Sequence, residues 1–396
     1  MVPKGWTLGT LKDLADTIMG YAFRSEDFVP TGIPLLRMGN LYQNTLDLNR
    51  NPVYLPDSFK FDYKRFLVSP GDLVMSMTGT MGKRDYGFTV EIPSNTQYSL
   101  LNQRVLKIVP KNNASSGYIL NLLRSELILS VLYSFPGGTK QANLSAKQLQ
   151  EIPVLIPPEL EQKKIAQILS TWDKAITVTE KLLVNSQQQK KALMQQLLTG
   201  KKRLLDENGL RFSREWQKGS LSVFCNIVKG KALSASELVS GHYPVIAGGK
   251  SSPYSHFNYT HENVVTVSAS GAYAGYVSYH KCKIWASDCS VISAKEGNLI
   301  QYFYQLLLSM QDKIYSLQSG GAQPHIYPKD LDSISILVPD VNEQQKIAAV
   351  LSAADAEITT LEKKLACLKE EKKALMQQLL TGKRRVKVEV EDTVCA

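Results

Sequence analysis

A chain of 396 residues is long enough for two or three domains, and 43% hydrophobic and 21% charged residues are typical of an ordinary folded protein. No run of about 18 apolar residues suggests a membrane span, and the start lacks a signal-peptide pattern. The five scattered cysteines argue against a disulfide framework, so we expect a cytoplasmic protein with no membrane partner. The net charge of +10 suits an anionic partner such as nucleic acid without establishing one.

The sequence predicts five segments in chain order: a globule (1–158), a long helix (159–203), a second globule (204–339), a second long helix (340–385) and an acidic tail (386–396). The two helices repeat each other. KKALMQQLLTG occupies Lys190–Gly200 and recurs, letter for letter, at Lys372–Gly382, an offset of 182 residues (372 minus 190). The match continues upstream at the same offset and without a gap to the start of each helix, so one helical unit is duplicated.

Both helices carry start and stop signals. Asp340 with Glu343 three residues later has the spacing of a capping box, in which both side chains bond backbone N–H groups of the first turn. Gly200 and Gly382 are placed to adopt the left-handed conformation that ends a helix. Each glycine precedes three basic residues, which suit the negative end of the helix dipole. A helix of about 40 residues would be roughly 60 Å long.

An apolar seam runs along each helix in steps of four and three residues, which is the pattern of a coiled coil. The apolar seam residues are Ile165, Leu169, Trp172, Ile176, Leu183, Leu193 and Leu197 in the first helix, and Ile347, Leu351, Ala354, Ile358, Leu361, Leu365, Leu368, Leu375 and Leu379 in the second. Lys190 and Lys372 interrupt the seam at equivalent positions, where they either set the helix register or face a partner. We expect an antiparallel coiled coil; the alternative is that each helix packs only on its own globule.

The globules repeat as well, although more loosely. Aligning Trp6 with Trp216 brings Gly20 onto Gly230. Downstream, PGDLVMSMTGTMG (70–82) is similar to HENVVTVSASGAYAG (261–275); both are strand-like runs that end in a Gly-rich turn. The predicted fold is therefore α+β, with two mixed α/β globules separated by two long helices and with internal pseudo-twofold symmetry, as in an isologous dimer.

No catalytic or metal-binding pattern is evident. GGKS (248–251) lacks the upstream glycine of a phosphate-binding loop, and no methyl-donor or Asn-Pro-Pro-aromatic motif occurs. All five histidines lie in the second globule near Cys282 and Cys289, but their spacing matches no zinc site. We expect no catalysis, metal or cofactor in this chain.

The ALMQQLLTG helix ends with their basic clusters, the Glu-Gln helix starts and the GDL strand resemble the specificity subunit of type I restriction–modification systems. That resemblance implies that the globules are target-recognition domains, each reading half of an asymmetric, bipartite double-stranded DNA target. It also implies that the helices set the half-site spacing and dock two methyltransferase subunits, with restriction/translocase subunits joining through the complex. S-adenosylmethionine, ATP and Mg²⁺ are then expected on those partner subunits.

DNA contacts are expected in polar, Gly-rich loops, since base reading requires donors and acceptors while Lys and Arg bind phosphates. The candidates in the first globule are Arg37, Asn40, Lys83, Arg84, Tyr86, Thr139, Lys140, Gln141 and Asn143. Those in the second are Lys250, Ser252, Tyr254, His256, Tyr273, Tyr276, Gln323 and His325. We expect Arg84 and Lys140 to be the strongest of these.

Two other classes of protein stay open at this point. One is a fused, DNA-recognising S-adenosylmethionine-dependent methyltransferase, which a methylation assay on the isolated chain would reveal. The other is a non-catalytic coiled-coil scaffold, which would not bind bipartite duplexes in a gel-shift experiment.

Overall fold

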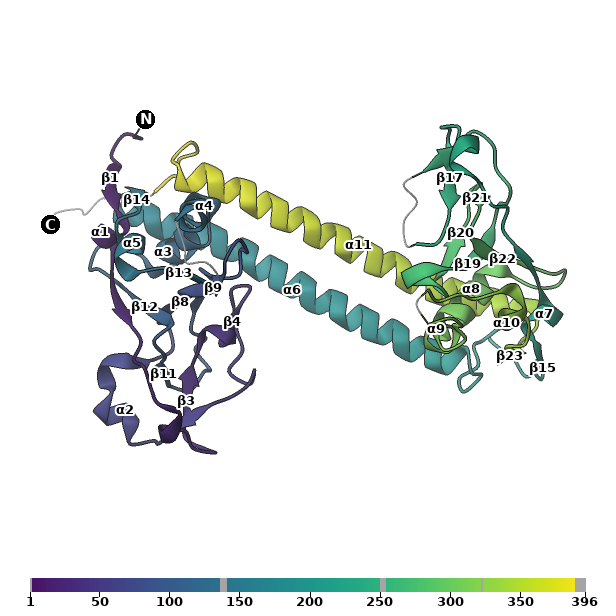
Figure 1. Ribbon diagram of the computed structural model, residues 1–396, viewed down its shortest axis with the longest axis horizontal. Helices are drawn as coiled ribbons and strands as arrows, with labels where there is room; N and C mark the ends of the chain where they lie inside the picture. Colours follow the sequence, from purple (N-terminus) through teal and green to yellow (C-terminus); the bar gives the residue numbers. More distant parts are fainter. Residues whose placement is uncertain (1, 136–140, 250–253, 322, 389–396) are drawn as a thin grey trace. The chain divides into compact units, whose positions relative to one another are not determined.

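The structure is a computed structural model that describes residues 2–135, 141–249, 254–321 and 323–388. The chain divides into two compact units, which are considered separately below. Unit 1 comprises residues 1–179 and 364–396, and unit 2 comprises residues 180–363. Each unit contains one globule and parts of both long helices, α6 (Glu159–Leu197) and α11 (Val341–Leu380) (Figure 1). Among the described residues, no helix combines the length and hydropathy that crossing a membrane requires.

The core of unit 1 is a four-stranded antiparallel sheet in the order β10-β8-β12-β2. Its central strand β8 is buried at all four positions, and side chains such as Leu73, Met75 and Ile108 pack with helix residues in one hydrophobic cluster. The elements of this half of the globule are β1 (Thr7–Thr10), α1 (Leu11–Leu14), β2 (Ala15–Met19), β8 (Leu73–Ser76), β10 (Thr89–Glu91), β12 (Val105–Pro110), α3 (Ser116–Leu123), α4 (Glu126–Ser134), α5 (Ala146–Gln150) and β14 (Pro153–Ile156).

Unit 1 has a second sheet, in the order β6-β3-β11-β7. Strands β3 and β11 run parallel, and a short β4–β5 hairpin follows β3. The elements are β3 (Ile33–Leu36), β4 (Leu41–Tyr42), β5 (Thr45–Leu46), β6 (Tyr54–Leu55), α2 (Phe59–Asp62), β7 (Leu67–Val68), β9 (Thr78–Thr80), β11 (Ser99–Leu101) and β13 (Gln141–Asn143), with 3-10 turns at Ser25–Asp27, Met38–Asn40 and Lys64–Phe66.

Unit 2 repeats this arrangement with a shorter second sheet. Its main sheet has the order β16-β22-β19-β20, and its second sheet has the order β18-β17-β21. The elements are β15 (Gln217–Ser220), α7 (Leu221–Phe224), β16 (Cys225–Lys229), β17 (Tyr243–Ile246), β18 (Ser255–His256), β19 (Val264–Ser268), β20 (Val277–His280), β21 (Trp285–Ala286), β22 (Cys289–Ala294), α8 (Ile300–Ser309), α9 (Gln311–Tyr315), α10 (Pro328–Asp332) and β23 (Ser335–Val338), with 3-10 turns at Ala235–Glu237 and Gly271–Tyr273.

The main sheets of the two globules therefore match strand for strand. The order β2-β12-β8-β10 in unit 1 corresponds to β16-β22-β19-β20 in unit 2. The glycines that the sequence aligned have the same role in both. A Cβ on Gly20 would lie 2.0 Å from the carbonyl oxygen of Asn102, and a Cβ on Gly230 would lie 2.3 Å from that of Ser287. Only glycine permits this close backbone approach.

The two long helices begin at Glu159 and Val341, within one residue of the predicted starts, and end at Leu197 and Leu380, before the predicted segment ends at 203 and 385. Gly200 and Gly382 have φ values of +71° and +66°, the left-handed conformation expected at these ends. All ten seam positions of each helix are buried or half-buried, including Lys190 and Lys372. In unit 2 the ammonium of Lys190 lies 2.5 Å from the carboxylate of Asp355. In unit 1 that of Lys372 lies 2.6 Å from Asp173. Both lysines therefore pair between α6 and α11, which favours the register role over a partner-facing one.

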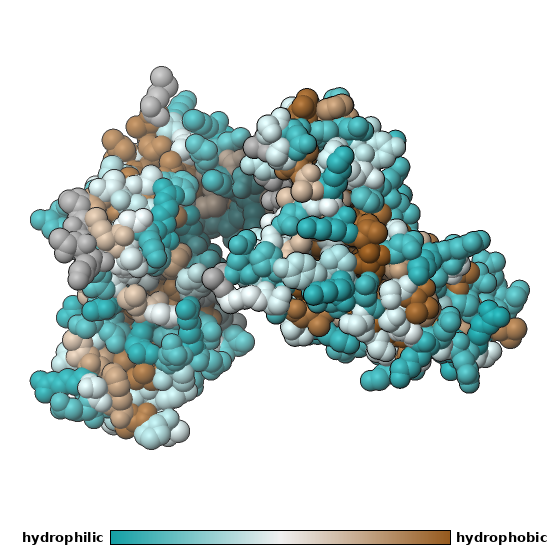
Figure 2. Space-filling view, turned by 45° about the vertical axis from the view of Figure 1, so that its right-hand side comes forward, coloured by the Kyte–Doolittle hydropathy of each residue, from teal (hydrophilic) through white to brown (hydrophobic). Residues whose placement is uncertain are grey.

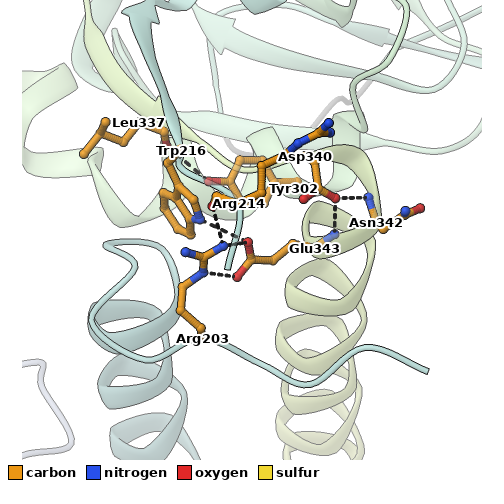
Figure 3. Close-up of polar contacts among 8 residues, drawn as sticks. All are labelled: Arg203, Arg214, Trp216, Tyr302, Leu337, Asp340, Asn342 and Glu343. Carbon is orange, nitrogen blue, oxygen red and sulfur yellow. Dashed lines mark hydrogen bonds and ion pairs between the residues drawn. The ribbon is translucent and has the colours of Figure 1, made fainter. Parts of the chain in front are cut away.

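A cluster of three side chains, here called the latch, fixes each globule to the start of its helix. In unit 2, the Glu343 carboxylate accepts bonds of 2.6 and 2.7 Å from the Arg203 guanidinium and one of 3.0 Å from the Trp216 indole (Figure 3). Glu343 is fully buried, so this charge is satisfied only by the latch. The capping-box prediction is therefore half wrong. Asp340 does accept the Glu343 backbone N–H, but the Glu343 side chain turns to Arg203 because only there does its buried charge find a cation.

Unit 1 contains the same latch with equivalent residues. The carboxylate of Glu161 accepts a 3.1 Å bond from the Trp6 indole and a 3.0 Å bond from Arg385. Arg385 also donates to the Lys4 carbonyl, so the N-terminal segment meets the residues that follow α11. The cation–π distances agree as well: Arg203 lies 5.6 Å from the Trp216 ring centroid, and Arg385 lies 5.7 Å from that of Trp6.

The glutamine that follows each latch glutamate ties the helix to the globule. Gln344 accepts a 2.8 Å bond from the Leu299 backbone N–H at the start of α8 and donates to Pro339. Gln162 does the same in unit 1, accepting from the Ser115 N–H at the start of α3. The Glu-Gln pair in the sequence thus has a structural role, because both side chains fasten a globule to its helix.

Candidate nucleic-acid interface

On the face in Figure 2, hydrophobic residues form small groups among hydrophilic ones. Single large apolar side chains do reach the surface, such as Phe61, which is 73% exposed. Exposed apolar residues of this kind are ordinary on protein surfaces, so the loops at the strand ends are the places to seek a nucleic-acid interface.

In unit 1, two of the predicted residues lie at a basic pocket. Arg37 and Asn40 follow β3, and the pocket, of about 430 Å³, also takes in residues of two other loops. Its lining is Arg37, Met38, Gly39, Asn40, Arg50, Asn51, Asn102, Gln103 and Arg104. No acidic side chain is among these residues, so the arginines set the charge of the pocket.

Asn40 does not present its amide to a ligand, which corrects its assignment as a base-contacting residue. It is 3% exposed, and its amide donates to the carbonyls of Asp47 and Arg50 at 2.8 and 3.1 Å. Its side-chain oxygen accepts a 2.9 Å bond from the Arg37 N–H. Asn40 therefore holds the loop after the β4–β5 hairpin in place, since its donors and its acceptor are all satisfied within the globule.

Tyr86 is likewise a core residue, and its assignment to DNA contact is wrong. It is 6% exposed, and its hydroxyl donates to the Leu132 carbonyl at 3.2 Å. Burial raises the pKa of its phenol. Arg84, two residues earlier, is exposed but already paired: one of its guanidinium nitrogens lies 3.1 and 3.2 Å from the carboxylate oxygens of Glu126. Lys83 is exposed beside it.

The last loop of unit 1 is described in part. Thr139 and Lys140 lie outside the described residues. Gln141 and Asn143 belong to strand β13, which pairs with β9 in the register Gln141–Thr80 and Asn143–Thr78. Ala142 between them is buried, so the two polar side chains lie on the opposite face of the ribbon. The structure thus brings this loop beside the Gly-rich turn at residues 78–84, although they are far apart in sequence.

In unit 2 the equivalent loops also meet. His325 forms bridges with Ser270 and Ser319, and the Gly271 N–H donates to the Pro324 carbonyl. Tyr273 and Gln323 are exposed on these two loops, Tyr276 is half-buried, and Tyr254 is 56% exposed elsewhere in the globule. Lys250 and Ser252 lie outside the described residues.

His256 is the third correction. It is 5% exposed, and its ring packs 4.4 Å from the Trp285 ring centroid and 4.7 Å from that of Phe257. Its Nδ1 accepts a 2.9 Å bond from the Asn258 N–H. His256 is therefore a satisfied core histidine, as its place on the short strand β18 allows. Within the described ranges, no three His, Cys, Asp or Glu side chains gather into a group that could hold a metal ion.

Two arginines that line the pocket, Arg50 and Arg104, are not among the candidates from the sequence. Arg104 ends the polar triplet Asn102-Gln103-Arg104 between two buried strands, β11 and β12, and that triplet is a loop signal visible in the sequence. Arg50 has no such signal, because it reaches the pocket only through the hydrogen bonds that Asn40 makes to its loop.

Comparison with known proteins gives a consistent result. The profile described as "Type I restriction modification DNA specificity domain" matches residues 3–185 and 213–370. The putative type I restriction enzyme MjaX specificity subunit of Methanocaldococcus jannaschii is 25% identical over 98% of this chain and 95% of its own length. The MjaIX specificity subunit of the same organism is 19% identical over 97% and 95%.

Solved structures show the same fold. The crystal structure of the type I restriction–modification S subunit from M. genitalium aligns over 96% of both chains with a TM-score of 0.68 and 17% identity. A second chain, from a structural study of complex assembly in a type I system, aligns with a TM-score of 0.55 and 15% identity over 97% of this chain. Since the family profile matches most of the chain, this protein belongs to the type I restriction–modification DNA specificity family, whose role is DNA recognition and not catalysis.

Proposed function

We propose that each globule of this specificity subunit reads one half of an asymmetric, bipartite DNA target. The observation that carries the proposal is the contrast between a duplicated frame and unlike loops. The latch and the buried Lys–Asp pair recur with the same residue types in both units. The loops at the strand ends share neither length nor charge. Two globules with the same fold but different loops suit two different half-sites, because each set of loops presents different hydrogen-bond donors and acceptors to the base edges.

The long helices would then form one antiparallel coiled coil that sets the half-site spacing. The Lys190–Asp355 and Lys372–Asp173 pairs support this part of the proposal, since each joins α6 to α11 with opposite chain directions. A helix of about 40 residues is roughly 60 Å long, which is adequate for half-sites about one DNA turn, or 34 Å, apart.

The repeated helix ends also suit two equivalent partner surfaces. The eleven residues Lys190–Gly200 and Lys372–Gly382 are identical, although only some of them are buried. Exposed residues such as Gln195 and Gln377 have no packing reason to repeat, so a shared partner would explain them. We propose that these ends dock two methyltransferase subunits, with restriction/translocase subunits joining through the complex. S-adenosylmethionine, ATP and Mg²⁺ would bind those partners.

Base-resolved mapping of methylated adenines in the host genome tests the reading function, and it should return two unlike half-sites at a fixed spacing. A matched helix insertion tests the spacing function. Four residues added to each helix lengthen it by about 6 Å. Because base pairs rise about 3.4 Å each, the tolerated spacing should shift by one or two base pairs. An unchanged spacing in a folded, active variant would rule out the ruler role of the helices.

A further inference from the structure

The basic pocket of unit 1 holds more positive charge than its own contacts neutralise. The Arg37 guanidinium donates to the carbonyl of Asn51. Among the residues that the structure describes, neither Arg50 nor Arg104 uses its guanidinium in a hydrogen bond or an ion pair; Arg50 only lies 5.0 Å from the Tyr42 ring centroid. The pocket thus combines three cations with a lining that contains no carboxylate.

Some other cations of the same globule have partners within it. Lys107 is paired with Asp72 at 2.6 Å, and Arg84 is paired with Glu126. Arg124 is used internally, donating to the carbonyls of Thr89 and Asn44. Like charges gathered without counter-charges repel each other, so a site of this kind gains most from a ligand that supplies acceptors.

Hydrogen bonds within the globule also hold the loops of the pocket in place. Asn40, buried, bonds the Arg50 carbonyl, and Asn51 adopts a φ of +50°, which turns its carbonyl to the Arg37 guanidinium. Asn accepts this left-handed conformation more readily than most residues. On the other side, the Arg104 carbonyl accepts a bond of 3.0 Å from the Met77 N–H, which fixes the backbone of that loop.

We propose that Arg50 and Arg104 form a bidentate acceptor-binding site through which the first globule holds its DNA half-site, with Arg37 and Asn40 as positioning residues. This inference rests on the proposed DNA-reading function. A guanidinium fork matches two kinds of DNA acceptor: the O6 and N7 atoms of guanine in the major groove, and two oxygens of a phosphate. The chemistry of the site is the same for both, and experiment separates them.

The experiment uses the full chain assembled with its methyltransferase subunits and the duplex found by methylation mapping. The Kd is measured by fluorescence anisotropy at several salt concentrations for wild type, Arg50→Ala, Arg104→Ala and Arg104→Lys. The duplex panel replaces each base pair of both half-sites in turn. Lys147→Ala is the control, because it removes the same unit of charge from α5 outside the pocket. Both arginines are exposed, so the variants are expected to fold.

If guanine is the ligand, Arg104→Ala binds about 5- to 150-fold more weakly, and the loss disappears on duplexes in which one guanine of a single half-site is already replaced. Arg104→Lys does not restore binding in that case. If phosphate is the ligand, the loss is uniform across the panel, the slope of log K against log salt falls by about 0.9, and Arg104→Lys largely restores binding. Either result supports the site.

Two results would overturn the site. One is that both alanine variants stay within twofold of wild type with an unchanged salt slope. The other is that Lys147→Ala weakens binding as much as they do. A wild-type complex that fails to bind any bipartite duplex would contradict the proposed function itself, so the two failures are distinguishable.

Discussion

The two globules share the strand order of their main sheets and differ in charge at one equivalent loop position. Arg104 immediately precedes β12, and Asp288 immediately precedes the equivalent strand β22. Their carbonyls have the same task, accepting from the N–H groups of Met77 and Ala269. Their side chains are opposite in charge, although the surrounding strand order is the same. A single loop position can therefore change from a donor to an acceptor of hydrogen bonds while the strands around it keep the same order.

The latches differ in burial, which gives the largest expected effect. Glu343 is fully buried and Arg203 is 20% exposed, whereas Arg385 of the other latch is 41% exposed. Glu343→Ala would leave Arg203 and the Trp216 N–H without their acceptor in a buried site, at a cost of about 3–5 kcal/mol. Glu161→Ala should cost less, because Arg385 can be solvated. Urea unfolding, with hydrogen exchange measured separately on peptides of each unit, checks both values.

Glu159→Ala is the matched control for the latch variants, since its ion pair with Lys163 is exposed and worth about 0–1 kcal/mol. Equal losses for Glu161→Ala and Glu343→Ala would contradict the inference that burial, and not the contact alone, decides the strength of each latch.

The charge reversal between Arg104 and Asp288 gives the second prediction. Asp288 is half-buried, and one of its carboxylate oxygens accepts from the Ser270 hydroxyl. A carboxylate reads amino donors such as cytosine N4. Asp288→Ala should therefore reduce discrimination at one base pair by about 1–3 kcal/mol, and only in the half-site that Arg104→Ala leaves unchanged. Anisotropy on the same duplex panel measures this. If Asp288→Ala and Arg104→Ala affected the same half-site, the inference that the two positions have equivalent roles in different globules would be wrong.

The buried lysines give the third prediction. Lys190→Met and Lys372→Met each remove an ion pair whose lysine is about nine-tenths buried and whose aspartate is partly exposed. We expect losses of about 1–2 kcal/mol, below that of a fully buried pair. The loss in unit 2 should be the smaller, because Gln305 still donates to Asp355 at 2.7 Å. Urea unfolding of the single variants, with Asp355→Asn and Asp173→Asn to complete double-mutant cycles, measures the coupling. Coupling energies near zero would leave the register to the apolar seam alone.

The two long helices were predictable because the same helical sequence occurs twice in the chain. Two copies of KKALMQQLLTG with glycine stops indicate two helix ends, and seam residues such as Leu169 and Leu351 follow from a period of 3.5. The role of Glu343 was not predictable in the same way. Its partner Arg203 lies 140 residues away, and the local capping pattern offered a simpler explanation that only tertiary packing overrides.

The loop residues show a different limit of sequence reasoning. Tyr86, Asn40 and His256 belong to segments that the sequence predicts to be polar loops, yet each is buried and hydrogen-bonded within its globule. Amino-acid type alone does not separate such residues from base-contacting ones. The basic pocket draws on loops around residues 37–40, 50–51 and 102–104, so it exists only once β3 and β11 have paired.

The smallest effect is expected for Arg84, which has an ion-pair partner, in contrast to Arg104 of the same globule. Both arginines are exposed, but Arg84 is held by Glu126 and lies 5.0 Å from the Tyr133 ring centroid. Arg84→Ala should weaken binding by less than about 1 kcal/mol, because DNA must first displace that carboxylate. The matched variant is Glu126→Gln, which frees the guanidinium; anisotropy should then show tighter binding and a steeper salt dependence if Arg84 faces DNA. Unchanged binding in both variants would show that Arg84 does not contact DNA. A loss for Arg84→Ala as large as that for Arg104→Ala would show that the ion pair with Glu126 does not keep Arg84 from binding DNA.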